Sequence, residues 1–138
     1  MEKIMKKILG IELGSTRIKS VLIDENANVL CQGGFEWENV LVDGLWSYPM
    51  ESVWKGLQVS FSSLAAEYKE KFGEELVRVD GIGISAMMHG YLAFDENGDL
   101  LAPFRTWRNT NTAEAADELT ELFKFHVPMR WSVSQYYQ

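Results

Sequence analysis

A glycine turn near the start of the chain carries the residues best suited to chemistry. Glu12 lies at the end of an apolar run, and the tight turn Gly14-Ser15-Thr16 precedes a second apolar run. Such a turn exposes consecutive backbone N–H groups and two hydroxyls, which can cradle phosphate oxygens. The Glu12 carboxylate is an oxygen ligand of the kind that Mg²⁺ prefers. The pattern alone is a weak signal, because the same residue types commonly make an ordinary β-turn.

The turn matches neither of the two common nucleotide-binding loops. A Walker loop requires Gly, Lys and Ser or Thr in succession, and this segment lacks that order. A dinucleotide fingerprint requires closely spaced glycines followed by a helix. Here Gly10 and Gly14 are too far apart, and a strand-like run follows them. Phosphate binding at this turn would therefore use a different kind of loop.

Two later segments hold side chains that could contact a ligand. Met88 and His89 follow an apolar run that ends at Ser85, and ligands of α/β proteins tend to bind beyond the C-terminal ends of strands. His89 carries one donor and one acceptor nitrogen, and Trp107 carries a large aromatic surface. Residue types alone leave open a structural role for His89 and a core role for Trp107, and we interpret His126 as structural.

The elements that must position these residues indicate an α/β domain. Short apolar runs at 7–13, 18–23 and 29–37, separated by turn residues, predict a three-stranded meander. Apolar residues at three- and four-residue spacing predict an amphipathic helix over 51–72. Gly73 follows as a helix stop.

The second half of the chain continues the alternation of strands and helices. The run at 79–85 predicts a buried strand, and 91–94 predicts another. A second helix is expected over 112–125, with Asn111 and Glu114 as its capping box. The order of strands and helices, with no repeat or low-complexity tract, is typical of an α/β domain.

The glycine turn resembles the first phosphate motif of the FGGY carbohydrate kinases. That family includes xylulokinases, ribulokinases and glycerol kinases, and belongs with actin and the heat-shock ATPases. Gly-Ile-Glu-Leu-Gly-Ser-Thr-Arg-Ile-Lys at 10–19 is similar to the family pattern Gly-Ile-Asp-x-Gly-Thr-x-x-x-Lys. The resemblance implies ATP as cosubstrate, with phosphate contacts from Gly14, Ser15, Thr16 and Lys19. It also implies Mg²⁺ near Glu12, which stands where Asp is usual and carries its carboxylate one methylene further out.

Two further segments carry the same resemblance. Ser-Ala-Met-Met-His-Gly at 85–90 is similar to the xylulokinase pattern Ser-x-Gln-Met-His-Gly, and 103–112 resembles Pro-x-x-x-Trp-x-Asp-x-Arg. The resemblance implies substrate contacts from Met88, His89 and Trp107. The His89 nitrogens would meet sugar hydroxyls, and the Trp107 indole would lie against the carbon face of the sugar. Met87, Asn109 and Asn111 stand where Gln, Asp and Arg are usual, so substrate choice stays open. The Met-His-Gly motif is closer to that of xylulokinases than to that of glycerol kinases, which favours a pentulose such as xylulose.

The resemblance also implies a ribonuclease H-like fold. Its mixed sheet has three antiparallel strands first and then parallel strands reached through helices. The family takes its catalytic base, an Asp, from later in the first domain and holds adenosine mainly with the second domain. We therefore expect 1–138 to be an incomplete first domain, with the base beyond Gln138 and no activity of its own.

One consequence and two alternatives accompany this interpretation. An incomplete domain leaves a sheet face or edge uncovered, so we expect self-association. The alternative function is a non-catalytic sugar- or partner-binding module derived from the kinase fold. A chaperone-like ATPase of the same superfamily is disfavoured, because such proteins lack the Met-His-Gly and Trp107 segments.

Composition limits the partners and the compartment. The net charge of -7, from 13 basic and 20 acidic residues, argues against nucleic acid, which draws on clustered Lys and Arg. No stretch approaches the roughly 20 apolar residues that span a bilayer. Cys31 is the single cysteine, which excludes an intramolecular disulfide and favours a reducing compartment. We expect a cytoplasmic protein whose partner is a small sugar.

Overall fold

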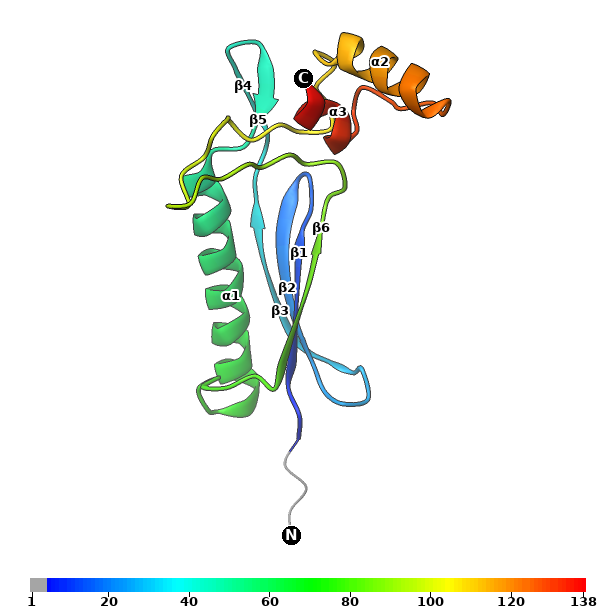
Figure 1. Cartoon of the computed structure of the whole chain (residues 1–138). Helices are drawn as coiled ribbons and strands as arrows, with labels where there is room; N and C mark the ends of the chain where they lie inside the picture. Colours follow the sequence, from blue (N-terminus) through cyan, green and yellow to red (C-terminus); the bar gives the residue numbers. More distant parts are fainter. Residues whose placement is uncertain (1–4) are drawn as a thin grey trace. The chain divides into compact units, whose positions relative to one another are not determined.

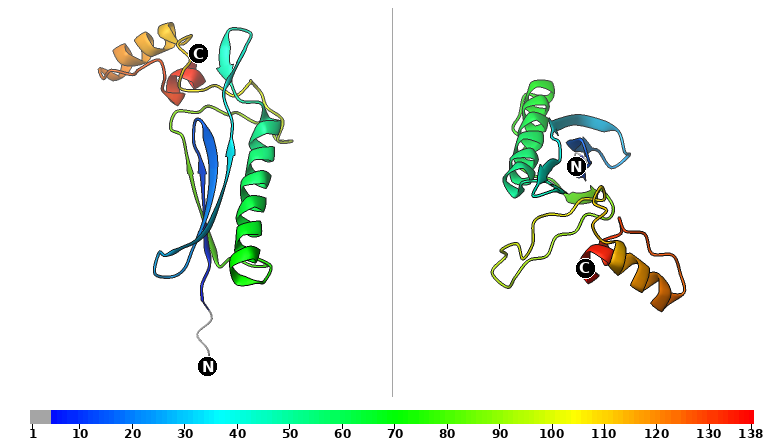
Figure 2. Two further views of the ribbon diagram at one scale, coloured as in Figure 1. Left: turned by 180° about the vertical axis from the view of Figure 1, so that it is seen from behind. Right: turned by 90° about the horizontal axis from the view of Figure 1, so that it is seen from above.

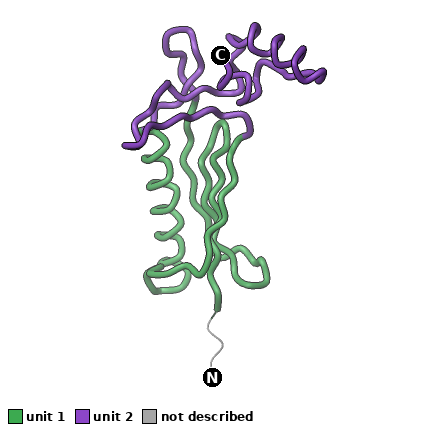
Figure 3. The backbone as a smooth tube through the Cα atoms, viewed as in Figure 1, with its two compact units in different colours: residues 1–38, 51–87 green, residues 39–50, 88–138 purple. Residues whose placement is uncertain are grey.

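The structure is a computed structural model of the chain and describes residues 5–138 (Figure 1). The chain divides into two compact units, shown in Figure 3. Unit 1 comprises residues 1–38 and 51–87, and unit 2 comprises residues 39–50 and 88–138.

Unit 1 is built on a four-stranded sheet in the order β3-β2-β1-β6. Strands β1 (Ile8–Leu13), β2 (Arg17–Ile23) and β3 (Val29–Glu36) pair antiparallel, as the predicted meander requires. Strand β6 (Gly81–Ala86) then pairs with β1 in parallel. This order confirms the expected change from antiparallel to parallel pairing.

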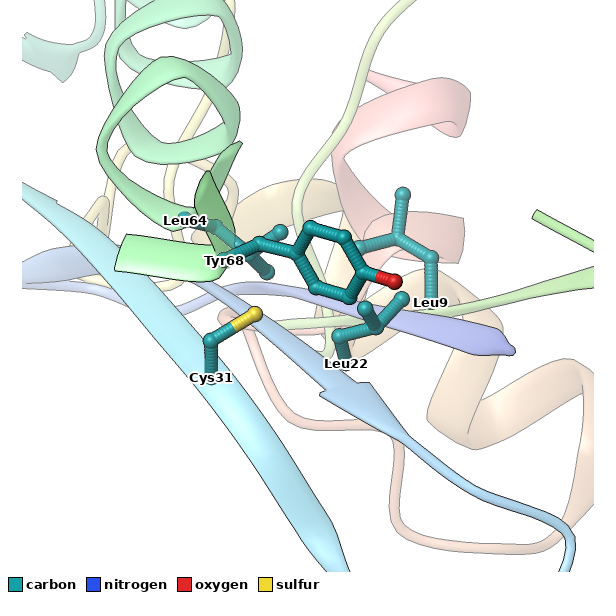
Figure 4. Close-up of a cluster of buried hydrophobic side chains, with 5 residues drawn as sticks. All are labelled: Leu9, Leu22, Cys31, Leu64 and Tyr68. Atoms are coloured by element: carbon teal, nitrogen blue, oxygen red, sulfur yellow. The ribbon is translucent and has the colours of Figure 1, made fainter. Parts of the chain in front are cut away.

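Helix α1 (Met50–Phe72) runs along one face of this sheet (Figures 1 and 2). Its predicted apolar face supplies two side chains to a buried cluster, and the strands supply three (Figure 4). The cluster consists of Leu9, Leu22, Cys31, Leu64 and Tyr68. The predicted stop is confirmed, because Gly73 has a φ of 72° and its N–H donates to Lys69 O at 2.9 Å.

The strand predicted at 79–85 forms, but it is not buried. Strand β6 lies at the edge of the sheet within the described residues and pairs there with β1 alone. Its register places Ile82 beside Leu9 and Ile84 beside Ile11, yet the two β6 isoleucines are 60% and 70% exposed. The core under α1 is centred on β1, β2 and β3. The apolar side chains of β6 therefore remain largely exposed, although their residue types led us to expect burial.

Unit 2 contains a hairpin that was not predicted from the sequence. Strands β4 (Val40–Val42) and β5 (Leu45–Ser47) pair antiparallel across a two-residue turn. Asp43 and Gly44 both have positive φ, 50° and 79°, as a type I′ turn requires, and Asp-Gly is a strong signal for such a turn.

The strand predicted at 91–94 is wrong. Only two isolated bridges form there, between Tyr91 and Arg105 and between Phe94 and Leu100. After Phe94 the chain turns at Asp95, whose carboxylate accepts N–H groups at Asn97 and Asp99, both at 2.9 Å. The turn places Leu100 opposite Phe94, and residues 92–93 form no ladder pair.

Unit 2 ends in two helices, α2 (Ala113–Phe123) and α3 (Ser132–Tyr137). The predicted capping box on α2 is wrong, because the N-cap is Thr112 and not Asn111. The Thr112 hydroxyl donates instead to Met129 O at 2.6 Å, which ties the start of α2 to the segment before α3. None of the helices within residues 5–138 is both long and apolar enough to cross a bilayer.

Candidate functional site

The predicted glycine turn joins β1 to β2. The Gly14 N–H donates to Arg17 O at 3.0 Å and closes the turn. A Cβ at Gly14 would lie 2.9 Å from that same oxygen, so the turn requires glycine. Gly14 therefore contributes a close backbone approach, while its own N–H is used inside the turn.

Trp37, the first residue after β3, donates two hydrogen bonds to backbone carbonyls of the turn. Its indole Nε1–H donates to Gly14 O at 2.8 Å, and its backbone N–H donates to Thr16 O at 3.2 Å. The side chain is only 6% exposed. Sequence reasoning did not single out Trp37, because an aromatic residue at a strand end carries no sign of a partner 23 positions away.

The residues predicted to contact phosphate and metal line one hollow. This hollow has a volume of about 730 Å³ and is formed entirely by unit 1. Its lining residues are Glu12, Gly14, Ser15, Thr16, Arg17, Lys19, Glu36, Trp37 and Glu38. The structure thus brings together all of the predicted phosphate and metal residues.

Charged side chains in the hollow are largely paired. Lys19 Nζ lies 3.2 Å from Glu12 Oε2, and Arg17 Nη2 lies 2.9 Å from Glu36 Oε1. These side chains are half exposed or more, so neither pair contributes much to stability. Counting Glu38, the hollow has three carboxylates and two cations. Such a balance does not attract a polyphosphate unless a cation accompanies it.

The oxygen ligands in the hollow suit a magnesium ion that is bound together with a phosphate. No group of three or more Asp, Glu, His or Cys side chains within residues 5–138 is arranged to hold a metal ion unaided. Mg²⁺ usually keeps several waters and is bound by one or two carboxylates together with substrate phosphates. Glu12 provides one such carboxylate, next to the Lys19 ammonium. The residues present therefore fit a Mg²⁺–phosphate complex.

In unit 2, His89 has an unusual backbone and an aromatic partner. Its φ is 62°, a conformation that non-glycine residues seldom adopt. Its ring stacks on Trp131, with centroids 5.6 Å apart and an interplanar angle of 13°. The ring of Phe125 lies on the same indole, with centroids 6.2 Å apart. Trp131 was missed by sequence reasoning, because the pairing joins residues far apart in the chain.

The other two predicted sugar contacts are accessible. Met88 is 74% exposed and Trp107 is 44% exposed. The Tyr91–Arg105 bridge places their two segments side by side and antiparallel. His89 and Trp107 each lie two residues from this bridge, towards the same end of it. The pairing therefore places the predicted sugar residues on two neighbouring segments of unit 2.

The loop that carries Trp107 is fixed by its neighbours. Asn109 is buried, and its side-chain amide forms two hydrogen bonds to the backbone of Trp46 on β5. Asn109 Oδ1 accepts from Trp46 N at 2.7 Å, and Nδ2 donates to Trp46 O at 2.8 Å. The Arg108 guanidinium lies 3.8 Å from the centre of the Trp46 ring. Trp107 is thus an accessible residue beside a firmly held one.

The sequence of the chain matches that of a known protein family. The model of the N-terminal domain of the FGGY family of carbohydrate kinases matches residues 7–129. The chain belongs to this family. The xylulose kinase of Lactococcus lactis is 29% identical over 125 residues, covering 85% of this chain and 23% of the relative. The gluconokinase of Bacillus subtilis is 26% identical over 120 residues, covering 86% and 22%.

The FGGY assignment agrees with the fold. A crystal structure of a xyloylose kinase from Brucella ovis superimposes with a TM-score of 0.81, at 24% identity, covering 94% of this chain and 28% of that one. This likeness confirms the predicted fold class, a mixed sheet with helices as in the sugar kinases. The FGGY chain described here spans about a quarter of the length of these relatives.

Proposed function

We propose that this chain is the N-terminal part of an ATP-dependent sugar kinase. The observation that carries the proposal is the hollow at the β1–β2 turn, where the residues predicted to contact phosphate and metal meet. Membership of the FGGY family supports the same reaction class. The proposed reaction moves the γ-phosphoryl group of ATP to a sugar hydroxyl.

Phosphoryl transfer needs positioning and charge stabilisation more than covalent chemistry. In the proposed enzyme, the backbone and hydroxyls of Ser15 and Thr16 hold phosphate oxygens. Glu12, together with the phosphates, would hold Mg²⁺, which would supply the positive charge that the acidic hollow lacks. Lys19, which pairs with Glu12 in the structure, would be the cation next to the phosphates.

The proposed sugar site lies in unit 2. His89 offers hydrogen-bonding nitrogens, and Met88 and the Trp107 indole provide apolar surface. We favour a pentulose such as xylulose, since a xylulose kinase is among the relatives. A gluconokinase is also among them, so a sugar acid is the competing substrate class.

Residues 1–138 alone should have no kinase activity. No Asp in this sequence matches the family's catalytic base, so we place that base beyond Gln138. We also propose that residues 1–138 belong to a first domain that continues further. Phosphorylation of any sugar by the 138-residue chain would contradict this part of the proposal.

A coupled assay of ATP consumption by the longer protein tests the function. The panel should hold pentuloses, hexuloses, polyols and gluconate, with Mg²⁺ present. A rate that depends on one sugar class is expected, and no rate on any member would contradict the kinase proposal. Glu12→Gln should lower kcat/KM for ATP by about a hundredfold, as the loss of a transition-state charge contact does. Glu70→Gln, an exposed change on α1, is the matched control.

A further inference from the structure

Trp37 contacts the phosphate turn through two donors at once. Its indole Nε1–H donates to Gly14 O, and its backbone N–H donates to Thr16 O, at 2.8 and 3.2 Å. Both oxygens belong to the turn between β1 and β2. Trp37 itself follows β3, so the contact joins the turn to a different strand.

These two bonds determine which way the turn's peptide groups face. A trans peptide is planar, and its N–H points opposite to its C=O; none of the described peptide bonds is cis. With Gly14 O held against Trp37, the N–H of Ser15 points away from the indole. With Thr16 O held against Trp37, the N–H of Arg17 also points away from it.

The orientation matters because carbonyl and amide groups have opposite effects on an anion. A turn whose peptides were flipped would present carbonyl oxygens to a phosphate and repel it. Trp37 also lines the same hollow as the turn, and its side chain is almost fully buried. A buried indole has little freedom to let either carbonyl rotate.

We propose that Trp37 is the positioning residue of the phosphate turn. It holds the carbonyls of Gly14 and Thr16 so that the amides of Ser15 and Arg17 are the groups offered to a phosphate. This inference rests on the proposed phosphate site and adds to it a residue that touches no phosphate.

The test compares polyphosphate binding by the ¹⁵N-labelled 138-residue chain and its variants. Tripolyphosphate with Mg²⁺ is titrated, and amide shifts at Ser15 and Arg17 are followed by NMR. Trp37→Phe removes the Nε1–H and should raise the Kd about three- to tenfold, the effect of losing one hydrogen bond. Between the wild type and Trp37→Phe, amide shifts should differ over residues 14–17, while the rest of the spectrum is unchanged. Trp54→Phe, at a side chain that is 61% exposed, is the control.

A second variant covers the case in which Trp37→Phe does not fold. Replacement of Trp37 by β-(3-benzothienyl)alanine keeps the ring shape and removes only the N–H donor. Equal Kd values for this variant and the wild type would overturn the inference while the phosphate site stands. If the wild type shows no shifts at Ser15 or Arg17, the phosphate site fails and the positioning role fails with it.

Discussion

Asn109 illustrates how one side chain can replace a strand. Its amide accepts from Trp46 N and donates to Trp46 O, so it completes both halves of a backbone pair. A carboxylate could make only the first of these bonds, because an ionised Asp has no donor. The resemblance drawn from the sequence places Asp here in most family members. In this chain the amide is required by the contact with β5.

The first prediction follows from that chemistry. Asn109→Asp places a carboxylate oxygen against Trp46 O in a buried position, and the free energy of unfolding should fall by about 1–3 kcal/mol. Urea unfolding measures the change. Asn111→Asp makes the same substitution at an exposed position and should stay within about 0.5 kcal/mol. Equal losses in the two variants would contradict the bridging role of Asn109.

The convergence of residues close in sequence was predictable, and that of residues distant in sequence was not. Glu12, Ser15 and Lys19 converge on one hollow because they flank the same hairpin turn. Trp37 and Trp131 escaped prediction because their partners, Gly14 and His89, lie elsewhere in the chain. A tryptophan's sequence neighbours do not reveal which carbonyl or ring it will meet.

At the scale of elements, α1 lies close against β3 because Gly33 has no side chain. A Cβ there would meet Ser60 O and lie 2.7 Å from Leu64 N, both in the helix backbone. Backbone atoms cannot move aside as a flexible side chain can. Gly34 faces the other way, and its Cβ would meet nothing nearer than 3.6 Å.

The second prediction uses these adjacent glycines as a matched pair. Gly33→Ala should push α1 off the sheet and lower the free energy of unfolding by about 3 kcal/mol or more. Gly34→Ala should have little effect, since its Cβ makes only ordinary contacts. Thermal unfolding followed by circular dichroism distinguishes the two. A Gly33→Ala variant as stable as Gly34→Ala would show that the helix can shift without cost.

The third prediction concerns the link between Glu67 on α1 and β3. The Gln32 N–H donates to the Glu67 carboxylate at 2.7 Å and, with the Lys71 ammonium, holds the pKa of Glu67 below its ordinary value. A lowered folded pKa adds stability above the unfolded pKa, near 4.3 for Glu, and that stability is lost as pH falls through the folded value. Glu67→Gln should therefore flatten the acid side of the stability profile. Glu70→Gln should leave that slope unchanged, and identical slopes in both variants would contradict the link.

Long periodic elements were predictable, and short ones were not. Helix α1 and the first three strands follow from patterns that repeat over many residues. The β4–β5 hairpin has strands of only three residues each, which is too short for alternation to be recognised. The bridges near Tyr91 and Phe94 likewise depend on partners beyond a turn. Burial of β6 was wrongly predicted because composition does not tell which strand lies at an edge.

At the scale of the whole molecule, the sheet of unit 1 ends at β6. This strand, Gly-Ile-Gly-Ile-Ser-Ala, has no charged residue and no proline, the features that commonly protect an edge from pairing. Its two isoleucines are largely exposed. An edge of this kind is a template for another strand, so the expected self-association belongs here.

The fourth prediction is that residues 1–138 self-associate through β6. Sedimentation velocity over a concentration series should show a species larger than the monomer. Ile84→Lys places a charge on the edge and should shift the distribution to monomer, because burying an unpaired ammonium in a strand pair is costly. Val77→Lys, at an 88% exposed position outside the strands, should change nothing. A wild-type chain that stays monomeric throughout would refute the prediction. If the dimer persists in both lysine variants, the contact must lie on another surface. Of the two substituted positions, Ile84 lies on β6 and Val77 does not.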